Sequence, residues 1–216
     1  MMKRLVIFDL DGTLLNTIED LAQATNHALE CCGYATHDTE KYRYFVGNGI
    51  NKLFERALPE DKRDYDNVMK IRSLFIPYYN IHNHDFTRPY DGMTSILSEL
   101  QKKGIMIAVA SNKYQSATEG LVKEYFPDIK FIKILGQREG VPTKPDPTII
   151  YEIMKAAKAT KEETLYIGDS NVDMQTANNA GVDGVGVEWG FRTREELLQN
   201  NPYAVIKKVE EILPLL

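Results

Sequence analysis

The sequence predicts an α/β fold, in which a doubly wound parallel sheet carries one inserted helical segment. Short apolar runs alternate with helical patterns along most of the chain, which is typical of a parallel sheet covered by helices. The alternation stops once, over residues 17–85, where helical periodicity continues without a convincing strand. We therefore expect an insertion after the first strand of the sheet rather than a tandem domain.

The composition limits the class of protein. With 216 residues, of which 43% are hydrophobic and 26% charged, the chain can bury ~70–75% of its unfolded surface without a disulfide or a metal. These values exclude a wholly disordered chain, collagen and a bare coiled coil. A net charge of −5 argues against a nucleic-acid partner, because neutralising phosphates requires a basic face. The longest apolar runs have four to six residues, so we expect no membrane span.

Five apolar runs are predicted to form the strands of the sheet: residues 5–8, 105–110, 131–135, 165–167 and 182–187. The helices expected between and after them are residues 94–103, 148–159, 173–180 and 204–213. The first of these helices stops at Gly104, a natural C-cap residue. Together these elements predict a catalytic core of residues 1–15 and 86–216.

The interruption is predicted to be a helical cap of residues 16–85. Helical patterns run over residues 18–32, 51–57 and 63–80. In the first of them the apolar residues lie on one side, as expected of a packed helix. An insertion after the first strand of a parallel sheet lies over the carboxyl ends of the strands, where such folds bind ligands.

The cysteines and the amino-terminal residues indicate the compartment. Cys31 and Cys32 are neighbours on a predicted helix, which makes a poor disulfide framework. Residues 1–4 are basic, but the apolar stretch after them meets Asp9 too early for the core of a signal peptide. We therefore expect two reduced thiols in a cytoplasmic protein.

Two carboxylates directly follow the first predicted strand. Asp9 and Asp11 are spaced i, i+2, so both side chains can project towards one site, and Gly12 allows a sharp exit of the backbone. The alternative is a simple Asp-Gly turn with Asp9 on the surface.

Further polar residues follow the other strands. Ser111 and Asn112 come after the second run, and Asp169 comes after the fourth, with Asp173 four residues later. Lys144 stands in a proline-flanked stretch ahead of a predicted helix. Because the carboxyl ends of parallel strands meet at one edge, we expect these side chains to share one crevice with the first pair.

The charges of this crevice predict a cation. Two like charges ~4 Å apart repel by ~4 kcal/mol at an effective dielectric constant of 20. Lys144 alone cannot balance four carboxylates, and no His or Cys in these segments suggests zinc. Oxygen ligands favour Mg²⁺. Mg²⁺ and a lysine beside a free carboxylate suit the attack of an anionic nucleophile on a phosphoryl group.

These segments resemble, in order and across the whole core, the four motifs of the haloacid dehalogenase superfamily. The matching segments are Asp9-Leu10-Asp11-Gly12-Thr13, Ser111-Asn112, Lys144, and Gly168-Asp169-Ser170 with Asp173. The helical insertion is similar to the first cap type of that superfamily. Within it the chain most resembles the phosphoglycolate phosphatase group, through Phe45-Val46-Gly47-Asn48-Gly49, Arg88-Pro89-Tyr90-Asp91-Gly92 and Trp189-Gly190-Phe191-Arg192.

The resemblance implies a Mg²⁺-dependent phosphatase acting on a small phosphorylated metabolite. Asp9 is then the nucleophile that forms an aspartyl-phosphate, and Asp11 is the general acid and base. The Asp9 carboxylate, the Asp11 main-chain carbonyl and Asp169 are the implied metal ligands, with Asp173 orienting them.

The resemblance also implies a set of substrate-binding residues. Ser111, Asn112 and Lys144 are expected to bind the phosphoryl oxygens, and Gly47 in the cap is expected to approach the substrate closely. Asn16 stands where many relatives carry Asp, and we expect it to cap the loop.

Alternatives remain open within and beyond this class. A sugar-phosphate mutase usually carries Val where this chain has Thr13, and phosphonate cleavage needs a cap lysine such as Lys41 or Lys52. A pyrophosphatase or a non-catalytic phosphate-binding module would keep the same crevice. A monomer and a homodimer fit the sequence equally well.

Overall fold

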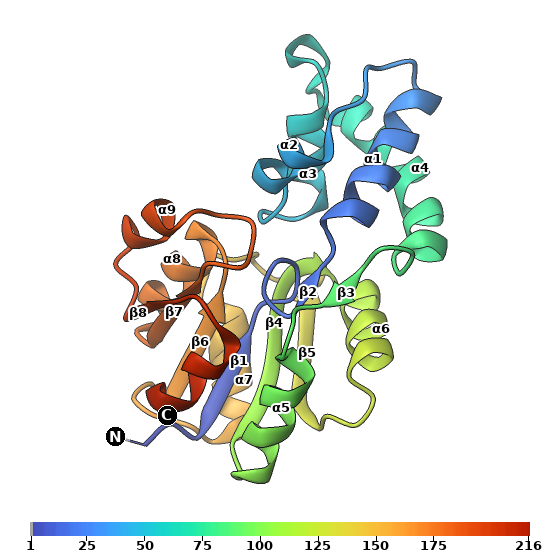
Figure 1. Ribbon diagram of the computed structural model, residues 1–216. Coiled ribbons are helices and arrows are strands. Elements are labelled where there is room, and N and C mark those ends of the chain that lie inside the picture. Colours follow the sequence, from blue (N-terminus) through green and yellow to red (C-terminus); the bar gives the residue numbers. More distant parts are fainter. Residues whose placement is uncertain (1) are drawn as a thin grey trace.

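The computed structural model describes residues 2–216; Met1, the first residue of the expected core, lies outside the described residues. A parallel six-stranded sheet forms the centre, in the order β5-β4-β1-β6-β7-β8 (Figure 1). Its strands are β1 (Leu5–Phe8), β4 (Met106–Tyr114), β5 (Phe131–Gln137), β6 (Thr164–Gly168), β7 (Asp183–Val187) and β8 (Ala204–Ile206). The predicted doubly wound α/β class is confirmed.

Both faces of the sheet are covered, because the strands alternate between two apolar sides. In β1, Val6 and Phe8 join one hydrophobic cluster, and Leu5 and Ile7 join the other. Helices α5 (Met93–Lys102) and α6 (Gln115–Tyr125) contribute to the first cluster, and α7 (Thr148–Ala157) and α8 (Asn171–Ala180) to the second. A short helix, α9 (Arg194–Leu198), packs against β7 and β8.

β1 lies at the point where the order of the strands in the sheet reverses, the topological switch point. From β1 the chain adds β4 and β5 on one side, and then returns to add β6, β7 and β8 on the other. Open α/β sheets bind ligands in the crevice outside the carboxyl ends of the strands at such a point. The residue after β1 therefore lies in the middle of the crevice.

Helices of the insertion lie beyond the carboxyl ends of the strands (Figure 1). They are α1 (Ile18–Cys31), α2 (Thr39–Phe45), α3 (Ile50–Ala57) and α4 (Tyr65–His82), with a 3₁₀ turn, η1 (Glu60–Lys62), before α4. Their apolar sides form a third hydrophobic cluster, which includes the fully buried Phe54, Phe75 and Tyr79. This cluster forms the core of the insertion, and Ala117 and Phe191 of the sheet domain also pack into it.

The chain passes between the sheet and the insertion twice, and the two passages are joined. The short strands β2 (Leu15–Asn16) and β3 (Arg88–Pro89) pair in an antiparallel ladder. The buried Asp20 carboxylate accepts bonds from the Phe86 N–H at 3.0 Å, the Thr87 N–H at 2.8 Å and the Thr87 hydroxyl at 2.6 Å. Asn16 Oδ1 accepts from the Ile18 N–H at 3.4 Å, as expected of a capping residue.

The predicted helix over residues 204–213 is wrong. The structure has the strand β8 there, followed by a 3₁₀ helix, η2 (Val209–Leu215). The reason is the open edge of β7: its backbone groups need partners, and the β-branched run before η2 supplies them. The spacing of apolar residues within this segment carries no information about a strand edge that another part of the chain provides.

Two further expectations concern membranes and disulfides. Within residues 2–216, no helix has the length and apolar character needed to span a bilayer. Cys31 and Cys32 are both free thiols.

Candidate active site

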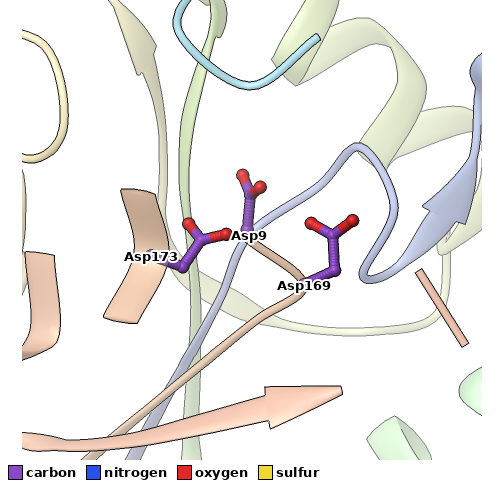
Figure 2. A group of neighbouring side chains, drawn as sticks. All are labelled: Asp9, Asp169 and Asp173. Carbon is purple, nitrogen blue, oxygen red and sulfur yellow. The ribbon is translucent and has the colours of Figure 1, made fainter. Parts of the chain in front are cut away.

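Three aspartates lie close together at the carboxyl ends of the central strands, where the strand order reverses (Figure 2). Asp9 follows β1, Asp169 follows β6, and Asp173 lies in the first turn of α8. One carboxylate oxygen of each lies within 4.8 Å of the others, and all three residues are buried. The strand ends therefore bring together residues that are 160 and more positions apart in the sequence.

Lys144 lies between two of these carboxylates. Its Nζ is 2.9 Å from Asp9 Oδ1 and 2.8 Å from Asp173 Oδ1, and the lysine side chain is 1% exposed. The Ala110 carbonyl at 3.0 Å and the Tyr166 hydroxyl at 2.8 Å also contact this nitrogen. The ammonium group is thus held at a fixed point beside Asp9.

Asp173 is fixed by the start of α8. Ser170 is the N-cap of this helix, and its hydroxyl donates to Asp173 Oδ2 at 2.5 Å while its N–H donates at 3.1 Å. The Tyr166 hydroxyl donates to Asp173 Oδ1 at 2.7 Å. This capping box makes Asp173 a rigid acceptor for Lys144. Sequence reasoning missed Tyr166; the need of a buried tyrosine hydroxyl for a partner could have indicated it.

The protonation equilibria show that this cluster lacks positive charge. Burial raises the pKa of Asp9 to about 7, although Lys144 acts in the opposite direction. Burial and the charges of Asp173 and Asp9 hold the pKa of Asp169 well above its usual value. Burial opposes the ionised forms of Asp173 and Lys144, but their mutual attraction leaves the pKa of Asp173 low and that of Lys144 high. Lys144 and Asp173 therefore form a balanced ion pair, whereas the negative charges of Asp9 and Asp169 are only partly balanced by nearby positive charge.

Asp169 is held by a loop that follows β7. The Phe191 N–H donates to Asp169 Oδ2 at 2.7 Å. Gly12 and Gly190 pack on the same carboxylate, and a Cβ atom at either position would overlap it. Gly12 also has a φ of +83°, so both its conformation and its contact require glycine.

Asp11 lies at the rim of the site and pairs with a lysine that the sequence reasoning left without a role. Lys113 Nζ is 3.0 Å and 3.2 Å from the two carboxylate oxygens of Asp11, and the Thr17 hydroxyl donates to Oδ1 at 2.7 Å. The same ammonium group lies 4.7 Å from the ring centroid of Tyr79, on α4. Lys113 is therefore a second buried cation in the crevice. Its position two residues after Ser111 could have indicated a common direction along an extended chain.

The end of β4 differs from the predicted strand, which stops at residue 110. The strand continues to Tyr114, but its pairing with β5 shifts register between Ala110 and Tyr114. Ser111 is buried there and lines the crevice. The Asn112 side chain is fully engaged: it donates to the carbonyls of Gly47 and Lys144, and accepts from the Lys144 N–H at 2.9 Å.

The insertion closes the crevice from the other side. The cavity between the two parts is small, about 30 Å³, and it opens to solvent. Its polar floor comes from the strand ends, and its roof comes from Gly47 and from apolar side chains of the insertion: Leu21, Val46, Ile50 and Leu53. Gly47 thus lies at the roof beside Asn112, where its carbonyl accepts a bond at 2.9 Å.

The residues present fit a divalent cation. Asp9 Oδ1 is buried, and although Lys144 lies nearby, no well-aligned hydrogen bond reaches it. The donors are oxygens alone, which suits a hard cation such as Mg²⁺. Among residues 2–216, Asp9, Asp169 and Asp173 form the one group of three such side chains close enough to hold an ion.

Buried carboxylates and lysines lie at the switch point of a doubly wound sheet, beneath a helical insertion. This arrangement is typical of an α/β enzyme. The profile of the haloacid dehalogenase-like hydrolases matches residues 6–187, so the chain belongs to that family. The resemblance found in the sequence motifs is confirmed.

Relatives and solved structures narrow the class. A phosphoglycolate phosphatase of Mesorhizobium japonicum is 31% identical over 98% of this chain and 94% of its own length. One of Pseudomonas syringae pv. tomato is 34% identical over 99% of this chain and 79% of its own length. A crystal structure from Lactobacillus delbrueckii, described as a candidate phosphoglycolate phosphatase, superposes with a TM-score of 0.92 at 31% identity and covers 98% of this chain and 97% of that one. The enzyme is thus a phosphatase, a hydrolase of phosphoric monoesters.

Proposed function

We propose that the enzyme hydrolyses a small phosphomonoester of the phosphoglycolate type, with Mg²⁺, through an aspartyl-phosphate on Asp9. The observation that carries the proposal is Lys144 Nζ, held 2.9 Å from Asp9 and 2.8 Å from Asp173 at the switch point of the sheet. A carboxylate in the middle of the crevice with a fixed ammonium group beside it can approach an anionic phosphoryl group.

Asp9 acts as the nucleophile in this proposal. Its carboxylate attacks phosphorus in line and displaces the alcohol of the substrate. Ser111 lines the floor of the cavity, and Lys144 Nζ lies 2.9 Å from Asp9 Oδ1 at that floor. In this proposal the Ser111 hydroxyl and the Lys144 ammonium group bind phosphoryl oxygens, whose charge grows in the transition state. The Asn112 side chain is already bonded to Gly47 and Lys144, so we assign the phosphate contact to the backbone of this segment, where the β4–β5 register shifts.

Asp11 acts as the general acid and base. It lies two residues beyond Asp9 and lines the same cavity. It protonates the departing alkoxide, and it then removes a proton from the water that attacks the aspartyl-phosphate. Lys113 and Thr17 hold its carboxylate until the substrate arrives.

Asp9, Asp169 and the Asp11 main-chain carbonyl are the proposed holders of Mg²⁺, with Asp173 fixing the arrangement through Lys144 and Ser170. When bound, the ion neutralises phosphoryl oxygens and the excess charge of the carboxylates. The Phe191 N–H keeps Asp169 in place for this role.

The cavity roof and the relatives support a small substrate. Apart from Gly47 and Gly49, the insertion lines the cavity with apolar side chains, and Arg192 of the loop after β7 lines it beside Gly47. The space enclosed above the polar floor is small. Relatives at 31% and 34% identity are phosphoglycolate phosphatases. We propose that residues 16–85 form a cap over a core of residues 1–15 and 86–216, moving about the β2–β3 pair. We also assign the enzyme to the cytoplasm, where its free thiols stay reduced.

The other chemistries have less support from this geometry. Phosphonate cleavage needs a lysine of the cap that faces the cavity, whereas Lys41 is exposed and Lys52 forms an exposed ion pair with Glu55. A mutase and a pyrophosphatase share the floor of the site, and the choice among them depends on the roof. A panel of phosphoglycolate, pyrophosphate, sugar phosphates and nucleotides tests the proposal: highest kcat/KM on a small carboxylated monoester supports it, and highest kcat/KM on pyrophosphate contradicts it.

Removal of the metal is expected to abolish phosphate release from p-nitrophenyl phosphate. The carboxylates would then repel both one another and the substrate, and the rate should fall by at least about 10²-fold, equivalent to a few kcal/mol of transition-state stabilisation. EDTA followed by excess Mg²⁺ should restore the initial rate in a continuous absorbance assay. Full activity in the chelator would contradict the metal assignment.

Asp11→Asn is expected to separate the two half-reactions. The p-nitrophenolate group leaves without protonation, so Asp9 should still be phosphorylated, but the amide cannot activate water and kcat should fall by about 10²–10⁴-fold. Acid quenching during turnover should therefore trap more aspartyl-phosphate than in the wild-type enzyme. A variant that hydrolyses at the wild-type rate would remove Asp11 from this role.

A further inference from the structure

The loop after β7 carries contacts that the catalytic proposal does not use. Arg192 donates from one guanidinium nitrogen to the Arg43 carbonyl and from another to the Val46 carbonyl, the latter at 3.0 Å. In the opposite direction, Arg43 donates to the Gly190 carbonyl at 3.2 Å. The guanidinium carbon of Arg192 lies 5.3 Å from the ring centroid of Tyr44. These bonds join the sheet domain to the end of α2.

The carbonyl groups at the end of α2 require hydrogen-bond donors from outside the helix. The last carbonyls of a helix lack partners within it and carry the negative end of the helix dipole. Arg56, from the insertion itself, satisfies the Tyr44 and Phe45 carbonyls at 3.2 Å and 2.9 Å. Arg192, from the other domain, satisfies the two that flank this pair. The second pair of bonds exists only while the insertion rests on the sheet domain.

The same loop also contacts the catalytic floor. The Phe191 N–H donates to Asp169 Oδ2 at 2.7 Å, and Gly190 packs directly on that carboxylate. The Phe191 side chain is buried in the hydrophobic cluster of the insertion. Successive residues of one loop therefore contact Asp169 on one side and the insertion on the other.

We propose that Arg192 is a positioning residue that latches the cap closed and, through the adjoining Phe191 N–H, sets the Asp169 carboxylate when the cap is closed. When the cap opens, the Arg43 and Val46 carbonyls return to water and the loop loses its anchor. Closure and a correctly placed Asp169 are then one event, so that the metal site is complete only when the substrate is enclosed. The kinetic part of this proposal rests on the proposed function, whereas the structural part does not.

Hydrogen–deuterium exchange of the full-length enzyme in Mg²⁺ tests the latch without turnover. Arg192→Ala should exchange the amides of residues 42–50 and 189–192 about tenfold faster, the change expected when charge-assisted bonds to carbonyls are lost. Arg194→Ala is the matched control, because Arg194 lies two residues away and its ion pair within residues 2–216 is with the partly exposed Glu188. It should exchange like the wild-type enzyme. Trp189 is the single tryptophan of the sequence and lies on this loop, so acrylamide quenching should rise in Arg192→Ala alone.

In Arg192→Ala the open cap should be more populated, so part of the binding free energy of the substrate must be used to close it. For the best phosphomonoester of the panel, KM should rise about tenfold in Arg192→Ala while kcat changes less than about threefold, since bound substrate itself favours closure. Arg192→Lys should recover little, because one ammonium group cannot span both carbonyls.

The outcomes separate the latch from its alternatives. Wild-type exchange in Arg192→Ala overturns the proposal, and so does a raised KM with unchanged exchange, which would indicate direct contact of Arg192 with the substrate. If Arg192→Ala does not fold, as judged by circular dichroism, the same comparison with Arg192→Lys decides. If no phosphomonoester is hydrolysed, the proposed function fails, and the exchange data still decide whether the latch exists.

Discussion

Asp9→Asn is expected to fold normally and to lose turnover by at least about 10⁴-fold, because the amide cannot form an acyl-phosphate with phosphorus. The side chain keeps its shape at the centre of the crevice, next to Lys144. Burial raises the pKa of the wild-type carboxyl to about 7, which means that the folded protein disfavours its ionised form. A neutral amide removes this unfavourable contribution. The melting temperature should therefore equal or exceed that of the wild-type enzyme.

The measurement for Asp9→Asn combines steady-state rates with trapping of the intermediate. Wild-type enzyme quenched in acid during turnover should carry an acid-stable, alkali-labile phosphate, and the variant should carry none. Asp128→Asn is the control, since Asp128 is exposed in the turn after α6 and does not line the crevice. Appreciable turnover by Asp9→Asn, or an alkali-labile phosphate on that variant, would assign the nucleophile to another residue.

Lys144→Met is expected to have the largest effect on stability. Removing the ammonium group leaves Asp173 buried without its cation, beside Asp9. Breaking a buried ion pair on one side typically costs 3–5 kcal/mol, which for a chain of this size lowers the melting temperature by roughly 6–20 °C. The methionine side chain fills a similar volume, so the loss reports charge rather than a cavity. Activity should fall as well, because Lys144 is a proposed phosphate-binding group.

Tyr166→Phe is the matched control for Lys144→Met. It removes a hydroxyl that bonds to both Lys144 and Asp173 but keeps the ion pair between them. A hydrogen bond contributes about 0.5–1.5 kcal/mol net, so this variant should melt only a few degrees lower. Thermal unfolding of both variants in the same buffer makes the comparison. Equal melting temperatures for the two would contradict the central place of the Lys144–Asp173 pair in stability.

Most of the floor of the candidate site could be predicted because its residues lie next to locally recognisable elements. Asp9 and Asp169 follow runs that alternate or stay apolar over a few residues, and such runs are strands by their own composition. The carboxyl ends of parallel strands meet by geometry, so residues far apart in the sequence could be placed in one crevice. The roles of these residues remain predictions, and the experiments above test them.

Residues whose role depends on a distant partner were not predictable in the same way. Lys113 was left without a role, since nothing in its neighbourhood shows that Asp11, 102 positions away, is its partner. Arg192 was singled out only as part of a matching segment, and its contacts with carbonyls at the end of α2 and just after it span 146 positions and more. The end of the chain was mispredicted for a related reason, because the strand β8 forms on an edge that β7 provides.

The sequence by itself determined the alternation of strands and helices, the helical interruption after the first strand, and the carboxylates that end β1 and β6. Those features depend on side-chain periodicity and on residues a few positions apart, which a chain carries before it folds. Only the tertiary structure decided which cation faces which carboxylate and how the insertion rests on the sheet. Ion pairs and bonds to helix ends are made between groups that become neighbours only after packing, and their energies depend on burial that no local pattern encodes.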